Sequence, residues 1–338
     1  LGIAALAIFL TVGILTHLFM IDGPLHTIKL LKRLRNAGGA ITAFDYSRIK
    51  LFHNLVSAAI VLIVMHILLA WSTGETAARL GLMGTAGGVA VAIYLYHKIA
   101  RPILHARRPA TVQAVDTLAP SLTRLRLAPH PRRPLRHRAG QFCYLRLWSK
   151  QCGYEEHPFT IASAPGAPEI EFTIKALGDY TSRLRNVAPG TTALVDGPYG
   201  TFTPDLSAAP HLFVAGGIGI TPFMSILEHI RHTPPQQPVV LVWSTRTARE
   251  QFAADDFSRM AGEQPRFHFV SAVTRETPPE GSSGRITTEM LQHLLHRHAP
   301  TGARAYICGP EPMRKAVTGM LRHLGLKRQD IHFERFSL

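Results

Sequence analysis

Cysteine is scarce in this 338-residue sequence, and its three cysteines form no Cys-x-x-Cys pair. Cys143, Cys152 and Cys308 therefore argue against a thiolate zinc site, a Cys-ligated iron–sulfur cluster and a disulfide-stapled secreted domain. A basic segment ahead of the first apolar run is also missing, which argues against a signal peptide. Because the sequence starts at Leu1, inside an apolar run, we expect further membrane segments upstream.

Charged residues are also few, at 17% against 46% hydrophobic residues, so the chain has enough apolar surface to fold. The net charge is nevertheless +15, and eleven Lys or Arg residues face only three Asp or Glu residues within 1–110. The basic clusters there interrupt long apolar runs, a pattern typical of membrane proteins rather than of nucleic-acid-binding proteins. We therefore expect the lipid bilayer as a partner and no nucleic acid.

Three stretches are apolar enough to predict transmembrane helices. Residues 1–21 and 51–71 each lack a charged residue, and 80–96 is a shorter run that is rich in glycine and alanine. About 20 apolar residues are needed to cross the hydrocarbon core of a bilayer. The sequence therefore predicts three helices of a partial transmembrane domain.

The loops between these stretches predict their direction. Six Lys or Arg residues lie in 22–50 and four more in 98–108, whereas 72–79 has a single arginine. Basic loops stay on the cytoplasmic side of a membrane. We therefore expect a multi-pass cell-membrane protein whose remaining domains are cytoplasmic.

Beyond residue 110 the pattern is that of a soluble protein. Short alternating strands separated by Pro, Gly and Arg fill roughly 110–205 and predict a small antiparallel barrel. Strands alternate with helices after Pro210, which predicts a parallel doubly wound sheet. The predicted fold is therefore multidomain. Its expected domains are an α-helical transmembrane segment at 1–105, an antiparallel β-barrel at 106–206 and an α/β doubly wound domain at 207–338.

Two histidines lie in the second apolar stretch. His53 and His66 are thirteen residues apart, which separates them by about 20 Å along a helix. An imidazole inside a membrane is costly and usually functional, and neutral imidazole is a good axial ligand for haem iron. The spacing equally allows two polar side chains that face neighbouring helices. At about 100° per residue the two rings lie roughly 140° apart around the axis, which is unfavourable for two haems on one side.

A set of motifs in the barrel region suits a flavin. The segment 157–160 ends a predicted strand with ring and hydroxyl groups, and 175–182 combines a glycine with hydroxyls at a helix start. Backbone N–H groups at a helix start suit a pyrophosphate. Each motif is weak alone, so their order carries the information. The candidate flavin-binding residues are His157, Pro158, Phe159, Thr160, Ser163, Lys175, Gly178 and Thr181.

A strand, a glycine turn and a helix start follow one another at 211–222. The glycines let a dinucleotide pyrophosphate approach the backbone, and the helix N-terminus stabilises its charge. Pro222 replaces the last glycine of Gly-x-Gly-x-x-Gly, at a place where proline suits the first turn of a helix. An ordinary strand–helix turn is the alternative. The candidate nucleotide-binding residues are Gly216, Gly217, Gly219, Thr221 and Pro222.

Ser244 and Arg246 follow the next predicted strand. An acidic residue at such a place binds a ribose 2′-hydroxyl, whereas arginine accommodates a 2′-phosphate. Both residues are therefore candidates for nucleotide binding, and they favour NADPH over NADH. A solvated loop arginine is the alternative interpretation.

Together these motifs resemble the ferric reductase/NADPH oxidase family of transmembrane flavohaem enzymes, and the soluble part resembles the ferredoxin–NADP reductase superfamily. The resemblance rests on His157–Thr160, on Gly216–Pro222, and on His53 and His66, which match the second of the family's two haem-ligand helices. It implies FAD, NADPH (with NADH as the alternative) and b-type haem as cofactors, with His53 and His66 as metal ligands. The family's first haem-ligand helix has no counterpart in this sequence.

The resemblance also implies roles for residues near the end of the chain. Cys308 begins a Cys-Gly-Pro segment that is similar to the family's segment beside the nicotinamide, so Gly309 and Pro310 are implied cofactor-binding residues. Glu334 and Phe336 resemble the terminal acidic–x–aromatic group whose ring covers the flavin. Cys308, Glu334 and Phe336 are thereby the implied catalytic residues.

The function implied is that of an NAD(P)H-dependent transmembrane oxidoreductase. Electrons would pass from cytosolic NADPH through FAD and b-type haem to an extracytoplasmic acceptor, a small molecule such as ferric iron or oxygen, or a protein. Two alternatives stay open. One is a membrane-anchored, haem-free flavin reductase that feeds a protein partner, and the other is a non-catalytic haem-binding membrane subunit.

Overall fold

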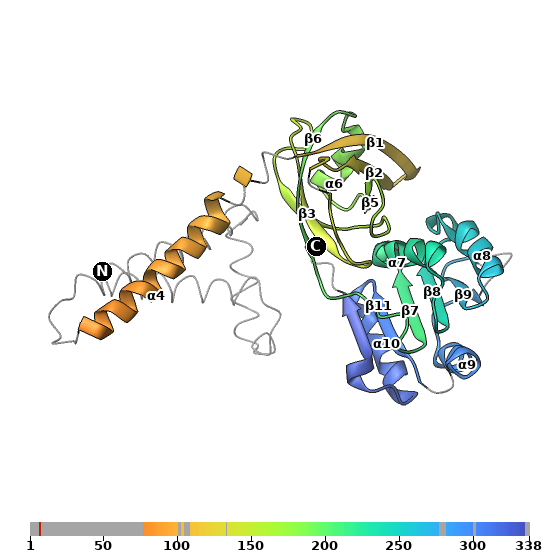
Figure 1. Cartoon of the computed structure of the whole chain (residues 1–338). Helices are drawn as coiled ribbons and strands as arrows, with labels where there is room; N and C mark the ends of the chain where they lie inside the picture. The colour runs from red at the N-terminus through yellow and green to blue at the C-terminus, as the bar shows by residue number, and fades with distance from the viewer. Residues whose placement is uncertain are drawn as a thin grey trace. The chain divides into compact units, whose positions relative to one another are not determined.

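The chain forms two compact units, Leu1–Ile103 and Leu104–Leu338 (Figure 1). In the first unit, helix α4 (Ala77–Leu95) is followed by a π-helical turn, η3 (Tyr96–Ala100). This computed structural model describes Ala7 and residues 77–100, 103–104, 109–132, 134–276, 282–299 and 302–334.

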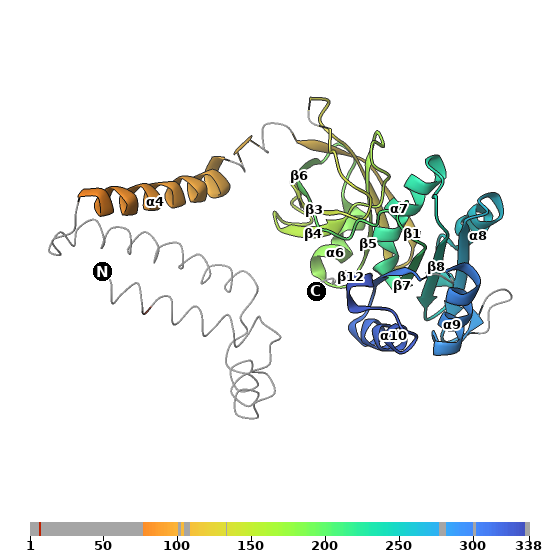
Figure 2. The same cartoon turned by 60° about the horizontal axis from the view of Figure 1, so that its bottom comes forward.

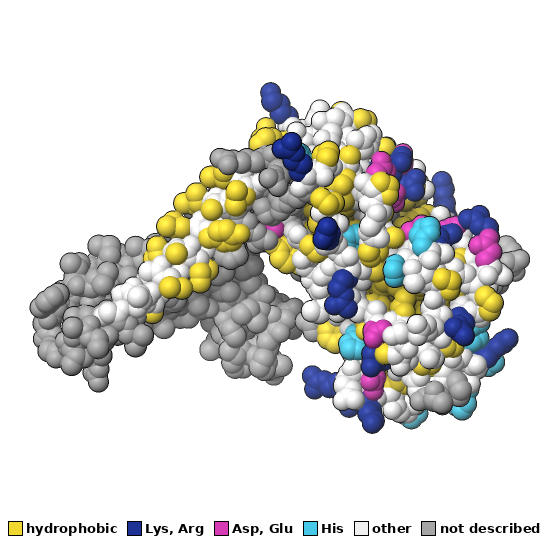
Figure 3. Space-filling model, viewed as in Figure 1, with side chains coloured by type: hydrophobic (Ala, Val, Ile, Leu, Met, Phe, Trp, Pro, Cys, Tyr) yellow, Lys and Arg dark blue, Asp and Glu magenta, His cyan; other side chains and the backbone are white. Residues whose placement is uncertain are grey.

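Helix α4 coincides with the third stretch that the sequence predicts to span a membrane. Hydrophobic side chains are exposed along it (Figure 3), among them Val89 at 58% and Ile93 at 55%. None of the helices in the described ranges is both long and apolar enough to cross a bilayer. The other two predicted spans, Ala7 apart, and both predicted haem ligands, His53 and His66, lie outside the described residues.

The second unit begins with a six-stranded antiparallel sheet (Figures 1 and 2). Its strands are β1 (Ala110–Ala119), β2 (Leu122–Ala128), β3 (Phe142–Leu147), β4 (Glu156–Thr160), β5 (Ile170–Lys175) and β6 (Thr192–Tyr199). They pair in the order β4-β3-β6-β1-β2-β5. Just past β4, the Ala162 N–H donates to the Glu171 carbonyl on β5 (2.7 Å) and so joins the two edge strands. The predicted barrel is confirmed.

The alternation of side chains along each strand produces the barrel core. On β3, Cys143, Leu145 and Leu147 are fully buried, whereas Tyr144 points outward and is 37% exposed. A short helix, α6 (Asp179–Arg183), follows β5, and its Tyr180 joins the same core. The barrel is thus closed around apolar side chains on the inside and carries aromatic side chains on its outer face.

The rest of the second unit is a six-stranded sheet in which all neighbouring strands run parallel. Its strands are β7 (His211–Gly216), β8 (Val239–Thr245), β9 (Phe267–Val273), β10 (Ser282–Ser283), β11 (Arg304–Cys308) and β12 (Ile331–Glu334). The helices between them are α7 (Thr221–His232), α8 (Ala254–Glu263), α9 (Thr288–His298) and α10 (Glu311–His323).

Helices cover both faces of this parallel sheet. Phe213 and Trp243 pack in one apolar cluster with residues of α7 and α8, whereas Val214 and Val242 pack in a second cluster with residues of α9 and α10. Strands that are buried on both faces read as continuous apolar runs, and Val239–Trp243 is such a run. The predicted doubly wound α/β domain is confirmed.

The direction of winding reverses between β7 and β11, because the sheet order is β10-β9-β8-β7-β11-β12. In open α/β sheets, ligands bind in the crevice outside the carboxyl ends of the strands at such a reversal. The register places Ala215 of β7 beside Cys308 of β11 at this end. The topology therefore points to the loops that begin at Gly216 and Gly309.

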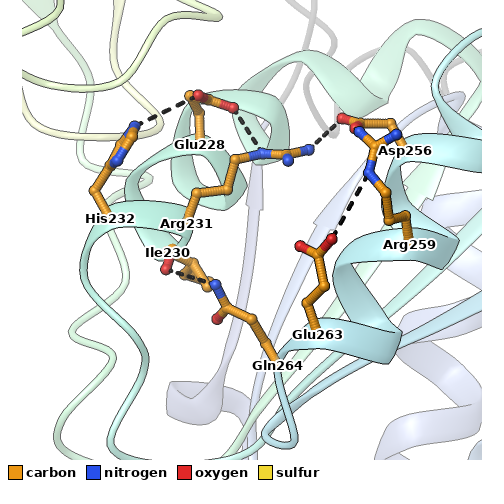
Figure 4. A network of polar contacts seen from close by, with 8 residues as sticks. All are labelled: Glu228, Ile230, Arg231, His232, Asp256, Arg259, Glu263 and Gln264. Carbon is orange, nitrogen blue, oxygen red and sulfur yellow. Dashed lines mark hydrogen bonds and ion pairs between the residues drawn. The ribbon is translucent and has the colours of Figure 1, made fainter.

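Helices α7 and α8 are joined by ion pairs at the surface (Figure 4). Arg231 of α7 pairs with Glu228 on its own helix (2.9 Å) and with Asp256 of α8. The Gln264 side-chain amide, just after α8, donates to the Ile230 carbonyl at 3.2 Å. These contacts fix α8 against α7, the helix that begins at the predicted nucleotide turn.

Candidate functional site

Two glycine loops pack backbone against backbone at the switch point of the sheet. A Cβ on Gly219 would lie 2.3 Å from the carbonyl oxygen of Cys308, and a Cβ on Gly309 would lie 2.9 Å from the Cα of Gly216. Real Cβ atoms do not approach so closely, so these positions require glycine. The two loops can therefore approach each other this closely only because glycine has no side chain.

Gly217 differs from its neighbours because it faces open space. Its φ is +54°, and a Cβ built on it would meet nothing within 4 Å. Its carbonyl accepts a hydrogen bond from the indole Nε1–H of buried Trp243 at 3.0 Å. This hydrogen bond fixes the backbone conformation of the turn, and the open space beside Gly217 stays accessible.

The turn leads directly into α7. A short 3-10 helix (Gly217–Ile220) precedes Thr221, and Pro222 lies in the first turn of α7, where no backbone N–H is lost from the helix. The first N–H groups of a helix and its dipole favour an anion. This geometry fits a dinucleotide pyrophosphate, in the place that the glycine pattern predicts.

A pocket of about 200 Å³ lies next to this turn, and both domains of the second unit line it. The barrel contributes Ser121 and Lys175, and the nucleotide-binding half contributes Gly217, Ile218 and Glu250. The Lys175 Nζ atom lies 3.8 Å from Glu250 Oε1. Lys175 is a predicted flavin ligand, but here it lies beside the nucleotide turn.

The loop after β8 brings an acidic residue, Glu250, close to the predicted Ser244 and Arg246. Ser244 is half-buried at the strand end, and the Arg246 side chain is exposed. The backbone N–H of Arg246 donates a hydrogen bond to Glu250 Oε2 at 3.0 Å, and this bond orients the Glu250 carboxylate in the pocket. Sequence reasoning missed Glu250, although an acidic residue after the second strand of such a fold is the known signal for a ribose hydroxyl.

On the barrel, the first candidate flavin residues surround Tyr180. The His157 Nε2 atom lies 3.0 Å from Glu155 Oε2, and the His157 ring centroid lies 4.1 Å from that of Tyr180. The Phe159 ring centroid lies 6.5 Å from that of Tyr180, with an interplanar angle of 18°. Thr160 is buried at the end of β4. His157 and Phe159 thus share one face of β4, and Pro158 between them is exposed.

The start of α6 is held by a hydroxyl. Thr181 Oγ1 accepts the N–H groups of Leu177 (2.9 Å) and Gly178 (3.1 Å), so the side chain of Thr181 closes the turn. The Tyr180 hydroxyl is buried and has no hydrogen-bond partner among the described residues, and burial raises its pKa. This neutral O–H donor beside His157 fits a polar cofactor group. Only its position in a predicted helix start could have indicated Tyr180 from the sequence.

Ser163 has its polar groups engaged within the protein. Its Oγ accepts the Glu171 N–H (3.1 Å), and its carbonyl accepts the Ser225 hydroxyl (2.7 Å) and the His137 Nε2–H (3.1 Å). The structure therefore places this candidate flavin residue between the barrel and α7.

Cys308 and Glu334 are neighbours in register at the ends of β11 and β12. The Cys308 thiol is fully buried, and burial raises its pKa, so it stays protonated. Burial also raises the pKa of Glu334. Pro310 occupies the residue position just before α10 at this edge, next to Gly216. Phe336, the predicted flavin cover, lies outside the described residues.

A barrel followed by a doubly wound domain, with a pocket between them, defines the class of two-domain flavin reductases. Residues 108–203 match the FAD-binding domain family, and residues 213–319 match the oxidoreductase NAD-binding domain family. The chain therefore carries an FAD-binding domain and an NAD(P)-binding domain, the pair found in NAD(P)H-dependent oxidoreductases. Both matches begin after residue 107, so they do not reach the predicted membrane helices or haem ligands.

Individual proteins show the same similarity. Over 236 residues the chain is 28% identical to the reductase component of propane 2-monooxygenase from Rhodococcus jostii (strain RHA1), covering 67% of this chain and 62% of that protein. It is 30% identical over 195 residues to one component of the Na(+)-translocating NADH-quinone reductase of Pseudomonas aeruginosa (strain UCBPP-PA14), covering 56% and 47%. The chain thus spans about half to two thirds of the length of these curated relatives.

A solved structure agrees on the fold. The ferredoxin NADP+ reductase from Neisseria gonorrhoeae, crystallised with bound FAD and NADP, matches with a TM-score of 0.57 and 24% identity. The match covers 67% of this chain and 97% of that one. It extends to the whole reductase fold and supports the two-domain organisation of the second unit.

Proposed function

We propose that this chain is an FAD-containing reductase that takes electrons from NAD(P)H and passes them to a separate acceptor. The observation that carries the proposal is the pocket between the barrel and the glycine turn, where Lys175 and Gly217 face a common space. The relatives named above support it, because each is the reductase part of a larger enzyme or a component of a reductase. A bound flavin supplies the conversion of a two-electron hydride into single electrons.

The chain's own residues would bind and orient the nucleotide. The Gly217 turn and the α7 N-terminus stabilise the pyrophosphate, since their N–H groups and dipole favour negative charge. Lys175 adds a cation to the lining of the pocket, 3.8 Å from Glu250. The buried Cys308 thiol stays neutral at the switch point and packs in the apolar core there rather than acting as a nucleophile.

The choice between the two nicotinamide nucleotides is set in this proposal by the loop after β8. Arg246 and Arg249 are exposed cations that suit a 2′-phosphate, and the Glu250 carboxylate, which lines the pocket together with Arg249, suits a 2′-hydroxyl. We propose that both nucleotides are accepted and that Glu250 shifts the preference toward NADH compared with what Arg246 alone implies.

A second candidate function is the transmembrane haem pathway. The spacing of His53 and His66 in an apolar stretch favours it, as does the resemblance to the ferric reductase/NADPH oxidase family. In that case the FAD-binding and NAD(P)-binding domains are cytoplasmic, the bilayer is a partner, and the acceptor lies outside. In the first candidate the apolar segment is a membrane anchor only and the acceptor is a protein on the same side as the flavin.

Two measurements on the full-length protein test these proposals. With added FAD, it should oxidise NADH or NADPH with a dye acceptor; no oxidation of either nucleotide would overturn the reductase proposal. A reduced-minus-oxidised absorbance spectrum then separates the two candidates. A b-type haem band that His53→Ala or His66→Ala removes supports the haem pathway, and a flavin-only spectrum supports the haem-free reductase.

A further inference from the structure

One backbone carbonyl of the barrel accepts a hydrogen bond from the nucleotide-binding domain. The Ser163 carbonyl, in the segment just after β4, accepts the Ser225 hydroxyl at 2.7 Å and the His137 Nε2–H at 3.1 Å. Ser225 is fully buried and lies within the first five residues of α7. The bond therefore connects the strand of the candidate flavin motif with the helix of the nucleotide turn, across 62 residues of sequence.

Both ends of this bond are rigid. On the barrel side, Ala162 and Ser163 are each bonded to the backbone of Glu171 on β5, at 2.7 and 3.1 Å. The start of α7 is held by the close packing of Gly219 against Cys308. A shift between α7 and the Ser163 carbonyl is therefore a shift between the nucleotide turn and the segment that joins β4 to β5.

The packing between the barrel and α7 around this hydrogen bond does not by itself fix the angle at which the two domains meet. A Cβ built on Gly140 would lie 3.5 Å from the Ile226 Cδ1 atom, so the barrel backbone lies within van der Waals range of an α7 side chain here. Apolar packing is non-directional, whereas a hydrogen bond fixes distance and angle. The Ser225 hydroxyl is thus a directional contact across this joint, in addition to the Lys175–Glu250 ion pair, and the His137 ring orients the Ser163 carbonyl from within the barrel.

We propose that Ser225, assisted by His137, is a positioning residue that sets the register between the flavin strand and the nucleotide turn through the Ser163 carbonyl. The proposal rests on the hydride transfer proposed above. Transfer requires the reacting atoms to lie about 3–3.5 Å apart, and a misplacement of about 1 Å by a distant mutation can cost about 100-fold in rate. Ser225 itself takes no part in the chemistry.

The test compares flavin reduction in Ser225→Ala and in the wild-type full-length protein, both loaded with FAD. In anaerobic stopped-flow experiments, we expect the limiting rate of flavin reduction to fall by about 10- to 100-fold. The Kd of the nucleotide should change much less than the rate, because the glycine turn is untouched. The long-wavelength charge-transfer absorbance between nicotinamide and flavin should weaken, a signature that a general loss of stability does not produce. The matched control is Ser258→Ala, an exposed serine on α8.

A second pair of variants protects the test against misfolding of Ser225→Ala. His137→Gln keeps a donor near the Ser163 carbonyl and should retain most of the charge-transfer absorbance, whereas His137→Leu should lose it. If Ser225→Ala loses FAD or unfolds, this pair decides.

Wild-type reduction rates and charge-transfer absorbance in FAD-loaded Ser225→Ala or His137→Leu would overturn the positioning role and leave the reductase proposal intact. Failure of the wild-type protein to reduce FAD with either nucleotide would instead remove the reductase proposal itself.

Discussion

The two ends of the parallel sheet are built on opposite principles. At the carboxyl ends of β7 and β11, glycines remove side chains so that backbones touch and a turn stays open to a pocket. Toward the amino ends, aromatic rings fill the space: the His211 ring centroid lies 5.8 Å from that of Tyr306, which stacks on His332 at 4.6 Å. His211 is 1% exposed.

This difference separates binding from stability within one sheet. The carboxyl end gives up side-chain packing to bring backbone N–H groups to a ligand, as a switch point requires. The other end buries large side chains and contributes to the free energy of unfolding. Substitutions at the first end should therefore act mainly on nucleotide binding and hydride transfer, and substitutions at the second end mainly on stability.

The largest effect should come from Gly219→Ala. Its Cβ would overlap the Cys308 carbonyl, so the turn or β11 must move, at a cost of about 1–3 kcal/mol. A displacement of about 1 Å in the turn should slow NAD(P)H-driven flavin reduction by about 100-fold. Stopped-flow flavin reduction and thermal unfolding check this.

The matched control for Gly219→Ala is Gly262→Ala on α8, whose Cβ would meet nothing within 4 Å. It should leave flavin reduction unchanged and stabilise the helix by up to about 1 kcal/mol. Equal rates in both variants would contradict the backbone-packing account of the turn.

The contribution of the amino end of the sheet to the free energy of unfolding should depend on pH. Burial lowers the pKa of His211 to about 4, with Arg304 acting in the same direction and the Ala209 backbone and Asp205 against it. The native state therefore favours the neutral ring, whose unfolded pKa is about 6.5. This stabilisation is complete above pH 6.5 and is lost as the pH falls toward 4. We expect a loss of roughly 2 kcal/mol between pH 7 and pH 5 in urea unfolding.

A pair of variants isolates the contribution of His211. In His211→Gln the pH dependence between 7 and 5 should flatten, although the variant is less stable at pH 7. His232→Gln, at a side chain that is 74% exposed, should keep the wild-type dependence. A wild-type slope in His211→Gln would show that another group causes the loss.

The glycine turn could be predicted from the sequence because its requirement is one of local backbone. Gly216, Gly217 and Gly219 are visible as a pattern, and the alternation of strands and helices places them at a helix start. The barrel was likewise predictable from period-two alternation in strands such as β3.

The contacts between the two domains were not predictable in the same way. Ser163 meets Ser225 over 62 residues, and Lys175 meets Glu250 only because β5 faces the loop after β8. Sequence motifs describe which side chains are present, whereas these pairs depend on how two folded domains pack. The motif around Lys175 therefore predicts a flavin-binding residue and gives no sign that Lys175 also lines a pocket beside the nucleotide turn.

A smaller effect should distinguish the two nucleotides at the carboxyl end. Glu250→Gln removes a negative charge from the pocket and should raise the ratio of kcat/KM for NADPH over NADH by about tenfold, or about 1.4 kcal/mol. The physical reason is that a carboxylate repels a 2′-phosphate and accepts from a 2′-hydroxyl. Steady-state kinetics with both nucleotides measure the ratio.

Glu263→Gln is the control for this nucleotide test, because its side chain lies on α8 and is 62% exposed. An unchanged ratio of kcat/KM for NADPH over NADH in Glu250→Gln would contradict a role of Glu250 and leave Arg246 as the residue that determines the preference.

The smallest effect should come from the ion pairs between α7 and α8, which belong to neither end of the sheet. Arg231 pairs with Glu228 and Asp256, and its side chain is 23% exposed, whereas Arg259, which also pairs with Asp256, is 63% exposed. Partly exposed ion pairs contribute about 0.2–1 kcal/mol and are weakened by salt. Arg231→Gln should therefore lower the Tm by only a few degrees at low salt, and by less at high salt, with flavin reduction unchanged. Arg259→Gln should lower it less, because solvent screens its pairs more strongly. If Arg231→Gln slowed flavin reduction, the face of α7 and α8 would belong to the binding end of the sheet, and the separation between the two ends would fail.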